Sequence, residues 1–110
     1  METYYRPADL PRFAEIGENA PELAEKFFAW YGAVFQDGAL TAREKALIAL
    51  GVAHAVKCPY CIDAYTQDTL SKGCDLDQLT EAVHVASAIV GGATLVHGVQ
   101  MRAIAKQQGM

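Results

Sequence analysis

The sequence predicts an all-α, single-domain protein. Apolar residues recur at helical spacing along almost all of its 110 residues, and neither a period-two run nor an Asn-Gly hairpin signal interrupts them. Proline, glycine and N-cap residues divide this pattern into about six segments of helical length, joined by short links. A chain of this size has room for one modest core. We therefore expect residues 1–110 to form one bundle of about six helices.

Two helices are expected in the first third of the chain. A short one should follow Asp9, because Pro11 suits a first turn. A second should begin after Asn19, which is a good N-cap residue and is followed by Pro21 in the opening turn. We expect this second helix to end at Gly38.

The third expected helix has a clear start signal. Thr41 and Glu44 stand in capping-box spacing, so the helix should begin sharply and run to about Lys57. Its middle is apolar on all sides. This pattern predicts burial against several neighbours.

Two cysteines open the fourth expected helix. Pro59 in "KCPYC" suits a first turn, so Cys58 falls at or beside an N-cap and Cys61 lies one turn inside; the helix should end at Gly73. The unpaired N–H groups and the dipole at a helix N-terminus lower the pKa of a thiol. A second thiol one turn away can condense with a sulfenic acid formed on the first, so the pair is suited to redox chemistry.

The last third of the chain should form two more helices. The fifth begins at its cap Asp75, and Gly91-Gly92 should separate it from a sixth. The third and fifth helices are apolar over more of their circumference than a small domain can cover, which favours a homo-oligomer. The alternative is close packing of alanine-rich helices within one chain.

Composition and charge narrow the class of protein. With 9 basic and 13 acidic side chains and no basic run, nucleic acid and anionic membranes are poor partners. The start, "METYYRPADLPRF", has no apolar signal region, and no segment reaches the length of a membrane span without charge or glycine. We expect a soluble, cytoplasmic protein. An odd number of cysteines, three, in such a chain argues against a structural disulfide framework.

Two other roles for the cysteine pair stay open. Buried structural thiols would be inert. A zinc site needs about four ligands, and no second Cys-x-x-Cys is present. His54 could add one ligand, and Cys74 or His84 another if the fold brought them close.

Two stretches carry a resemblance to a known family: "LTAREKALIALGVAHAVKCPYCIDAYT" and "EAVHVASAIVGGATLVHG". Their layout resembles the carboxymuconolactone decarboxylase superfamily in its alkyl hydroperoxidase D-like branch, and within it the arsenosugar biosynthesis-associated peroxidase-like proteins. The resemblance implies an all-helical fold and assembly into trimers or hexamers. It also implies reduction of hydroperoxides, without a cofactor, at the expense of a dithiol or lipoyl-type protein.

The resemblance implies roles for individual residues. Cys61 would attack the peroxide and Cys58 would resolve the product, although position at the helix start by itself favours Cys58. Peroxidases of the family have a histidine four residues after the second cysteine and a glutamate twelve before the first, which form a proton relay. These positions hold Tyr65 and Ala46 here. A phenol is a weak base near neutrality and alanine does not titrate, so the usual relay is missing.

His54 and Glu44 are the candidates to replace this relay. His54 is the stronger, because an imidazole can act as a base near neutrality and this residue would lie beside the pair if the third helix continued to Cys58. Glu44 lies on a different helical face from the relay position and more simply completes a capping box. Tyr65 could shape the pocket or hydrogen-bond a substrate oxygen. The candidate catalytic residues are therefore Cys61, Cys58, His54, Tyr65 and Glu44, with no metal or cofactor site.

The sequence thus predicts a thiol-dependent oxidoreductase that reduces a hydroperoxide or related thiophilic electrophile through a Cys58/Cys61 dithiol-disulfide cycle. One alternative is a non-catalytic thiol module that binds a soft metal or trivalent arsenic. A further alternative is a lactone decarboxylase-like enzyme, in which the cysteine pair would have no role.

Overall fold

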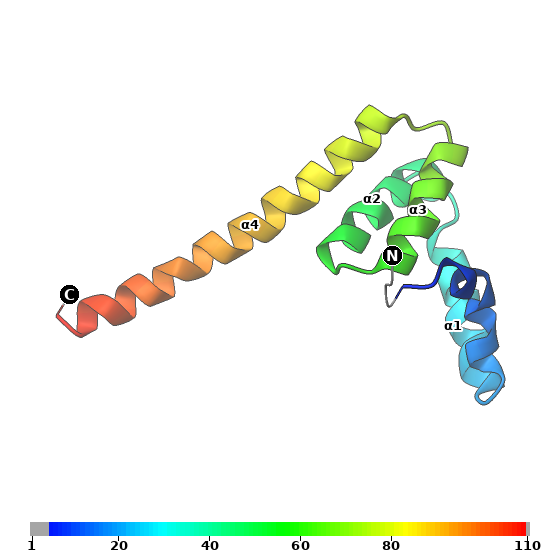
Figure 1. Ribbon diagram of the computed structural model, residues 1–110, viewed down its shortest axis with the longest axis horizontal. Helices are drawn as coiled ribbons and strands as arrows, with labels where there is room; N and C mark the ends of the chain where they lie inside the picture. Colours follow the sequence, from blue (N-terminus) through cyan, green and yellow to red (C-terminus); the bar gives the residue numbers. More distant parts are fainter. Residues whose placement is uncertain (1–4, 110) are drawn as a thin grey trace.

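The computed structural model describes residues 5–109, and these form five helices and no strand (Figure 1). In chain order they are the 3-10 helix η1 (Pro7–Gly17) and the α-helices α1 (Pro21–Val34), α2 (Ala42–Ala55), α3 (Pro59–Ser71) and α4 (Leu76–Gln107). The prediction of an all-helical fold is confirmed. The expected number of about six was too high by one, because the last two expected helices are a single helix. Residues 1–4, part of the N-terminal stretch considered above, lie outside the described residues.

The first two helices form a hairpin at one side of the molecule. η1 starts at Pro7, before Asp9, and takes the tighter 3-10 geometry with a second proline inside it. Gly17 lies where this hairpin closes, because a Cβ there would meet the Cβ of Ala24 at 2.7 Å. α1 has Ala20 as its N-cap, not the expected Asn19.

The end of α1 also differs from the prediction. The helix stops at Val34, four residues before Gly38, and a turn leads to the next helix. The Lys45 ammonium donates to the carbonyls of Val34 and Gln36 at 2.8 and 2.7 Å. A lysine of α2 therefore satisfies carbonyls that the end of α1 leaves without a helical partner.

The start of α2 is as expected and its end is not. Thr41 accepts from the Glu44 N–H at 3.0 Å, and the Glu44 carboxylate accepts from the Thr41 N–H at 2.8 Å, which completes the capping box. The helix ends at Ala55 because Lys57 adopts a left-handed φ of 57°. The Cys58 N–H then donates to the Ala53 carbonyl at 3.0 Å. The chain has turned before it reaches the cysteines.

The core lies where α2, α3 and α4 meet, and it is small. Its centre is Leu50, which is 1% exposed and packs with Cys74 and Leu79. α2 and α4 approach closely at Gly51, where a Cβ would lie 3.4 Å from the Ala82 carbonyl oxygen. Cys74 thus serves as a buried apolar residue, as expected for a thiol with no partner.

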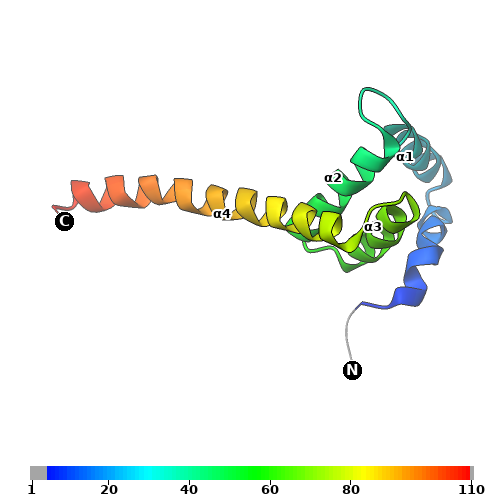
Figure 2. The same cartoon turned by 90° about the horizontal axis from the view of Figure 1, so that it is seen from above.

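α4 is one continuous helix of 32 residues, so the expected break at Gly91-Gly92 was wrong. The two glycines keep helical backbone, since among the described residues positive φ values occur only at Lys57, Gly73 and Gly109. Each glycine costs a helix about 1 kcal/mol relative to alanine, which a long helix tolerates. Figures 1 and 2 show the second half of α4 projecting from the rest of the molecule.

This projection leaves the chain far from compact. Its radius of gyration is 18.8 Å, whereas about 13 Å is typical of a compact domain of this length. Large apolar side chains on α4 are exposed, among them Ile89 at 70% and Leu95 at 79%. By length and composition alone α4 could also cross a membrane. No such segment was expected from the sequence, because the two glycines were expected to divide this helix.

Candidate active site

The cysteine pair lies at the first turn of α3. Cys58 is the N-cap with extended backbone, and Pro59 occupies the first helical position. The Sγ atom of Cys58 accepts the Cys61 N–H at 3.3 Å and lies 2.8 Å from the Cys61 Sγ atom. Both thiols are free. The two sulfurs need to approach by less than 1 Å to reach the ~2.05 Å length of a disulfide.

The surroundings of the pair shift its two thiols in opposite directions. The pKa of Cys58 is lowered, chiefly by the hydrogen bond from the Cys61 side chain and also by the backbone N–H groups of Cys61 and Tyr60, against the opposing effect of burial. The pKa of Cys61 is raised to about 11 by its burial and by the hydrogen bond and charge of Cys58. The thiolate therefore forms first on Cys58, and Cys61 keeps its proton.

A cavity of about 300 Å³ opens beside the two sulfurs, between η1 and the start of α3. It is lined by Asp9, Leu10, Phe13, Cys58, Tyr60 and Cys61. Both cysteines are partly exposed. A small molecule can therefore reach the sulfurs.

Two tyrosine–aspartate pairs connect the N-terminal segment to α3. The Tyr60 hydroxyl donates to Asp9 at 3.2 Å, and the Tyr5 hydroxyl donates to Asp63. The rings of Tyr5 and Tyr60 meet edge to face with centroids 4.7 Å apart. The Asp63 carboxylate has a lowered pKa because it accepts from Tyr5 and Gln67, so it is ionised at neutral pH. The same bond to Asp63 raises the pKa of Tyr5 to about 12.

His54 does not join the cysteine pair in this structure. The expected adjacency required the helix to continue to Cys58, and α2 ends at Ala55. The His54 Nδ1 atom lies 2.8 Å from the Leu50 carbonyl oxygen and donates to it. His54 lines a different hollow, between α2 and α4, together with Lys57 and Ser87. The proposed role of His54 as base therefore lacks the geometry on which it depended.

Tyr65 contacts α1 and is not among the residues that line the cavity beside the sulfurs. The hydroxyl shares a hydrogen bond with the Tyr31 hydroxyl, and the ring stacks on Phe35 with centroids 5.3 Å apart. Burial, followed by the bond to Tyr31, raises the pKa of Tyr65. Tyr65 is thus placed to join α3 to α1, and it is a poor proton acceptor at neutral pH.

Neither the second relay position, Ala46, nor the candidate replacement Glu44 supplies a base to the cysteine pair. Ala46 is fully buried, and Glu44 is exposed and held in the capping box with Thr41. The Thr41 backbone N–H is the main cause of the lowered pKa of Glu44. Of the five candidate catalytic residues, the structure brings only Cys58 and Cys61 together at the cavity.

Sequence reasoning did not identify the N-terminal wall of the cavity. Leu10, Phe13 and Tyr60, which line the cavity, were not among the candidate site residues. Tyr60 pairs with a residue 51 positions earlier, and no local pattern signals such a contact. The one available hint was a tyrosine placed between the two cysteines.

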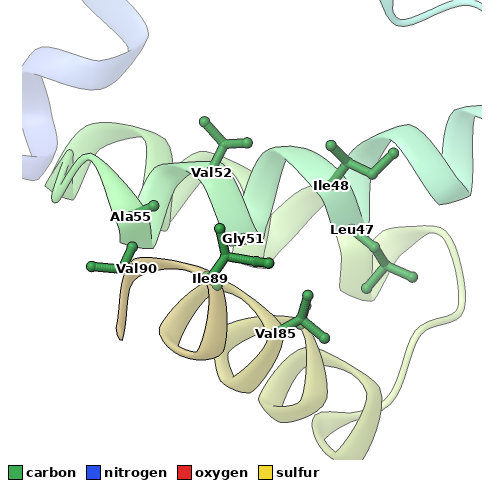
Figure 3. Close-up of a pocket in the computed structure, with 10 residues that line it drawn as sticks. Leu47, Ile48, Gly51, Val52, Ala55, Val85, Ile89 and Val90 are labelled. Atoms are coloured by element: carbon green, nitrogen blue, oxygen red, sulfur yellow. The ribbon is translucent and has the colours of Figure 1, made fainter. Parts of the chain in front are cut away.

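A second groove, between α2 and α4, has a volume of about 390 Å³ (Figure 3). Figure 3 shows Ile48 and Val52 of α2 above Val85 and Ile89 of α4. Its lining is hydrocarbon, without a nucleophile or a titratable group. Across residues 5–109, moreover, no group of three or more histidine, cysteine, aspartate or glutamate side chains is arranged to hold a metal ion. The cavity beside the cysteines is therefore the candidate active site.

Comparison with known families agrees with this fold and motif. The model of the Carboxymuconolactone decarboxylase family matches residues 21–102. The chain belongs to this family. An uncharacterized protein of the cox locus of Paracoccus denitrificans is 37% identical to this chain over 87 residues. The match covers 76% of this chain and 78% of the relative.

Several solved structures share the fold. A protein from Methanobacterium thermoautotrophicum is 34% identical with a TM-score of 0.74, over 76% of this chain and 94% of its own. A carboxymuconolactone decarboxylase family protein from Legionella pneumophila is 30% identical with a TM-score of 0.70, over 84% of each chain. One from Thermotoga maritima, with a suggested part in the antioxidative response, reaches a TM-score of 0.59 over 90% of this chain and 97% of its own. At 20% identity this last similarity shows the fold alone.

Proposed function

We propose that this family member is a thiol-dependent oxidoreductase that reduces a hydroperoxide or related electrophile through a Cys58/Cys61 dithiol-disulfide cycle. The observation that carries the proposal is the 2.8 Å separation of two free sulfurs at a helix N-terminus, beside a cavity. Membership of a family that includes peroxidase-like members supports it.

In the first step Cys58 is the nucleophile. Its thiolate attacks the terminal oxygen of the hydroperoxide, the O–O bond breaks, and Cys58 becomes a sulfenic acid while an alkoxide leaves. This order is the reverse of the one that the family resemblance implied. We prefer it because Cys58 receives the hydrogen bonds that favour a thiolate, whereas the surroundings of Cys61 favour the thiol.

Cys61 then supplies what the missing relay would otherwise provide. Its proton goes to the departing alkoxide, which leaves as the alcohol. The resulting Cys61 thiolate attacks the Cys58 sulfur and expels hydroxide, which forms the disulfide. An external dithiol or a lipoyl-type protein returns the pair to two thiols, so no bound cofactor is needed. His54, Tyr65 and Glu44 take no part in this sequence of steps.

We also propose that the working form is a homo-oligomer, a trimer or a hexamer, in the cytoplasm. The exposed apolar side chains of α4 and the groove between α2 and α4 support this proposal, since association would remove both from water. The area buried on α4 would offset the cost of extending this helix into solvent.

The proposal is tested by titrating thiols in the reduced protein after addition of hydrogen peroxide or cumene hydroperoxide. We expect two thiols lost per chain, a Cys58–Cys61 disulfide in peptide maps, and recovery with a dithiol. Cys58→Ser should consume no peroxide, and Cys61→Ser should stop at a sulfenic acid on Cys58 that dimedone traps. Stoichiometric binding of trivalent arsenic without any loss of thiols to peroxide would favour the thiol-binding module instead.

A further inference from the structure

We infer that η1 is the substrate-selecting wall of the dithiol site, in which Leu10 and Phe13 favour electrophiles with an apolar organic group over hydrogen peroxide. The inference rests on the proposed function for its physiological reaction. It concerns residues 7–17, which lie outside residues 21–102 matched by the family model.

The cavity presents mainly hydrocarbon to a molecule that approaches the sulfurs. Leu10 and Phe13 contribute apolar side chains from η1, and the ring of Tyr60 lies on the α3 side. The only carboxylate in the lining is Asp9, and it is already engaged: one oxygen accepts from Tyr60 at 3.2 Å, and the other lies 3.6 Å from the Arg12 guanidinium. The site is therefore expected to bind apolar groups better than polar groups.

η1 is held in place on both of its sides. The Tyr60–Asp9 and Tyr5–Asp63 hydrogen bonds connect the segment to α3. Phe13 meets Phe28 of α1 edge to face with centroids 5.0 Å apart. A wall fixed in this way can discriminate between substrates, because its side chains keep their positions when a ligand binds.

The size of the cavity sets the class of ligand. About 300 Å³ is at the lower end of small-molecule sites, enough for a short alkyl or single-ring organic group beside the reacting oxygen. Hydrogen peroxide has no organic group that could make apolar contacts with the wall. Removal of part of an apolar wall changes discrimination by about tenfold or more, because the substrate loses contacts that its smaller competitor never made.

The test compares KM and kcat for cumene hydroperoxide and hydrogen peroxide in Leu10→Ala and Phe13→Ala. We expect the KM for cumene hydroperoxide to rise about tenfold relative to the KM for hydrogen peroxide in each variant. Ile16→Ala is the matched control, since Ile16 is an apolar residue of the same 3-10 helix outside this cavity. Equal changes for both peroxides, or none, would overturn the inference.

A second measurement separates this inference from the proposed function and covers a Phe13→Ala variant that folds poorly. The rates at which N-phenylmaleimide and iodoacetamide modify Cys58 are compared in wild type and Leu10→Ala by peptide mapping. We expect the rate with N-phenylmaleimide, divided by the rate with iodoacetamide, to fall about tenfold in Leu10→Ala. A fall in this ratio without peroxide turnover in wild type would contradict the proposed function and support substrate selection by η1. Turnover in wild type with an unchanged ratio would contradict substrate selection by η1 alone.

Discussion

The Sγ atom of Cys58 lies 2.8 Å from the Sγ atom of Cys61, and the hydrogen bond between them is the largest of the effects that lower the pKa of Cys58. Only the thiolate is alkylated, so the alkylation rate rises with pH through the pKa and then levels off. A lowered pKa moves this rise to lower pH. We expect the midpoint for Cys58 to lie below the ~8.5 of a free cysteine, and Cys61→Ala to move it upward.

The matched control for this profile is Cys61→Ser. A serine hydroxyl still donates to the Cys58 thiolate, so the midpoint should move less than in Cys61→Ala. The rates are measured with iodoacetamide and read at Cys58 by mass spectrometry. A midpoint that stays in place in Cys61→Ala would show that Cys61 does not stabilise the thiolate.

His54 offers a second test, because the structure separates it from the pair. We expect His54→Ala to keep the peroxide rate of wild type, within about twofold, across neutral pH, since the side chain donates to the Leu50 carbonyl and lines another hollow. His84→Ala, an exposed position on α4, is the control. A large loss of the peroxide rate in His54→Ala, with the rate of His84→Ala unchanged, would restore His54 as the base.

The Tyr31–Tyr65 hydrogen bond should contribute to stability and not to chemistry. We expect Tyr31→Phe and Tyr65→Phe each to lower the free energy of unfolding by about 1 kcal/mol, because each leaves the other hydroxyl without this partner. The double variant should cost less than the sum of the two. Urea denaturation measures the three values, and the peroxide rate serves as the control that should not change.

The capping box of α2 separates a structural role for Glu44 from a catalytic one. Thr41→Ala should lower the free energy of unfolding by about 1 kcal/mol. Glu44→Gln should cost little, because glutamine also serves at this position of a capping box, and the peroxide rate should stay the same. If Glu44→Gln instead slowed peroxide reduction with stability intact, Glu44 would belong to the proton path.

Local signals in the sequence were sufficient for much of the fold. The capping box at Thr41, the cap residue Asp75 and the proline after Cys58 placed three helix starts correctly, because each signal depends on residues within one turn. The predicted break at Gly91-Gly92 was wrong because glycine only weakens a helix. Helical backbone on both sides of the glycines was enough to continue through them.

The site was predictable only in part, for a different reason. The Cys-x-x-Cys spacing placed both sulfurs at the start of α3, but the cavity beside them depends on contacts across more than 50 residues. Tyr5–Asp63 and Tyr60–Asp9 leave no local pattern. His54 was expected beside the pair, but the left-handed residue Lys57 separates α2 from Cys58, and helical spacing does not extend across such a turn.

The exposed apolar side chains of α4 should be covered by other copies of the chain. We expect Ile89→Glu and Leu95→Glu to shift the protein from an oligomer toward a monomer in light scattering, because a charge cannot be buried there without a partner. Gln100→Glu is the control, since it adds the same charge at an exposed polar position of the same helix and should leave the mass unchanged. A wild-type mass equal to that of one chain, with α4 still helical, would contradict assembly through this helix.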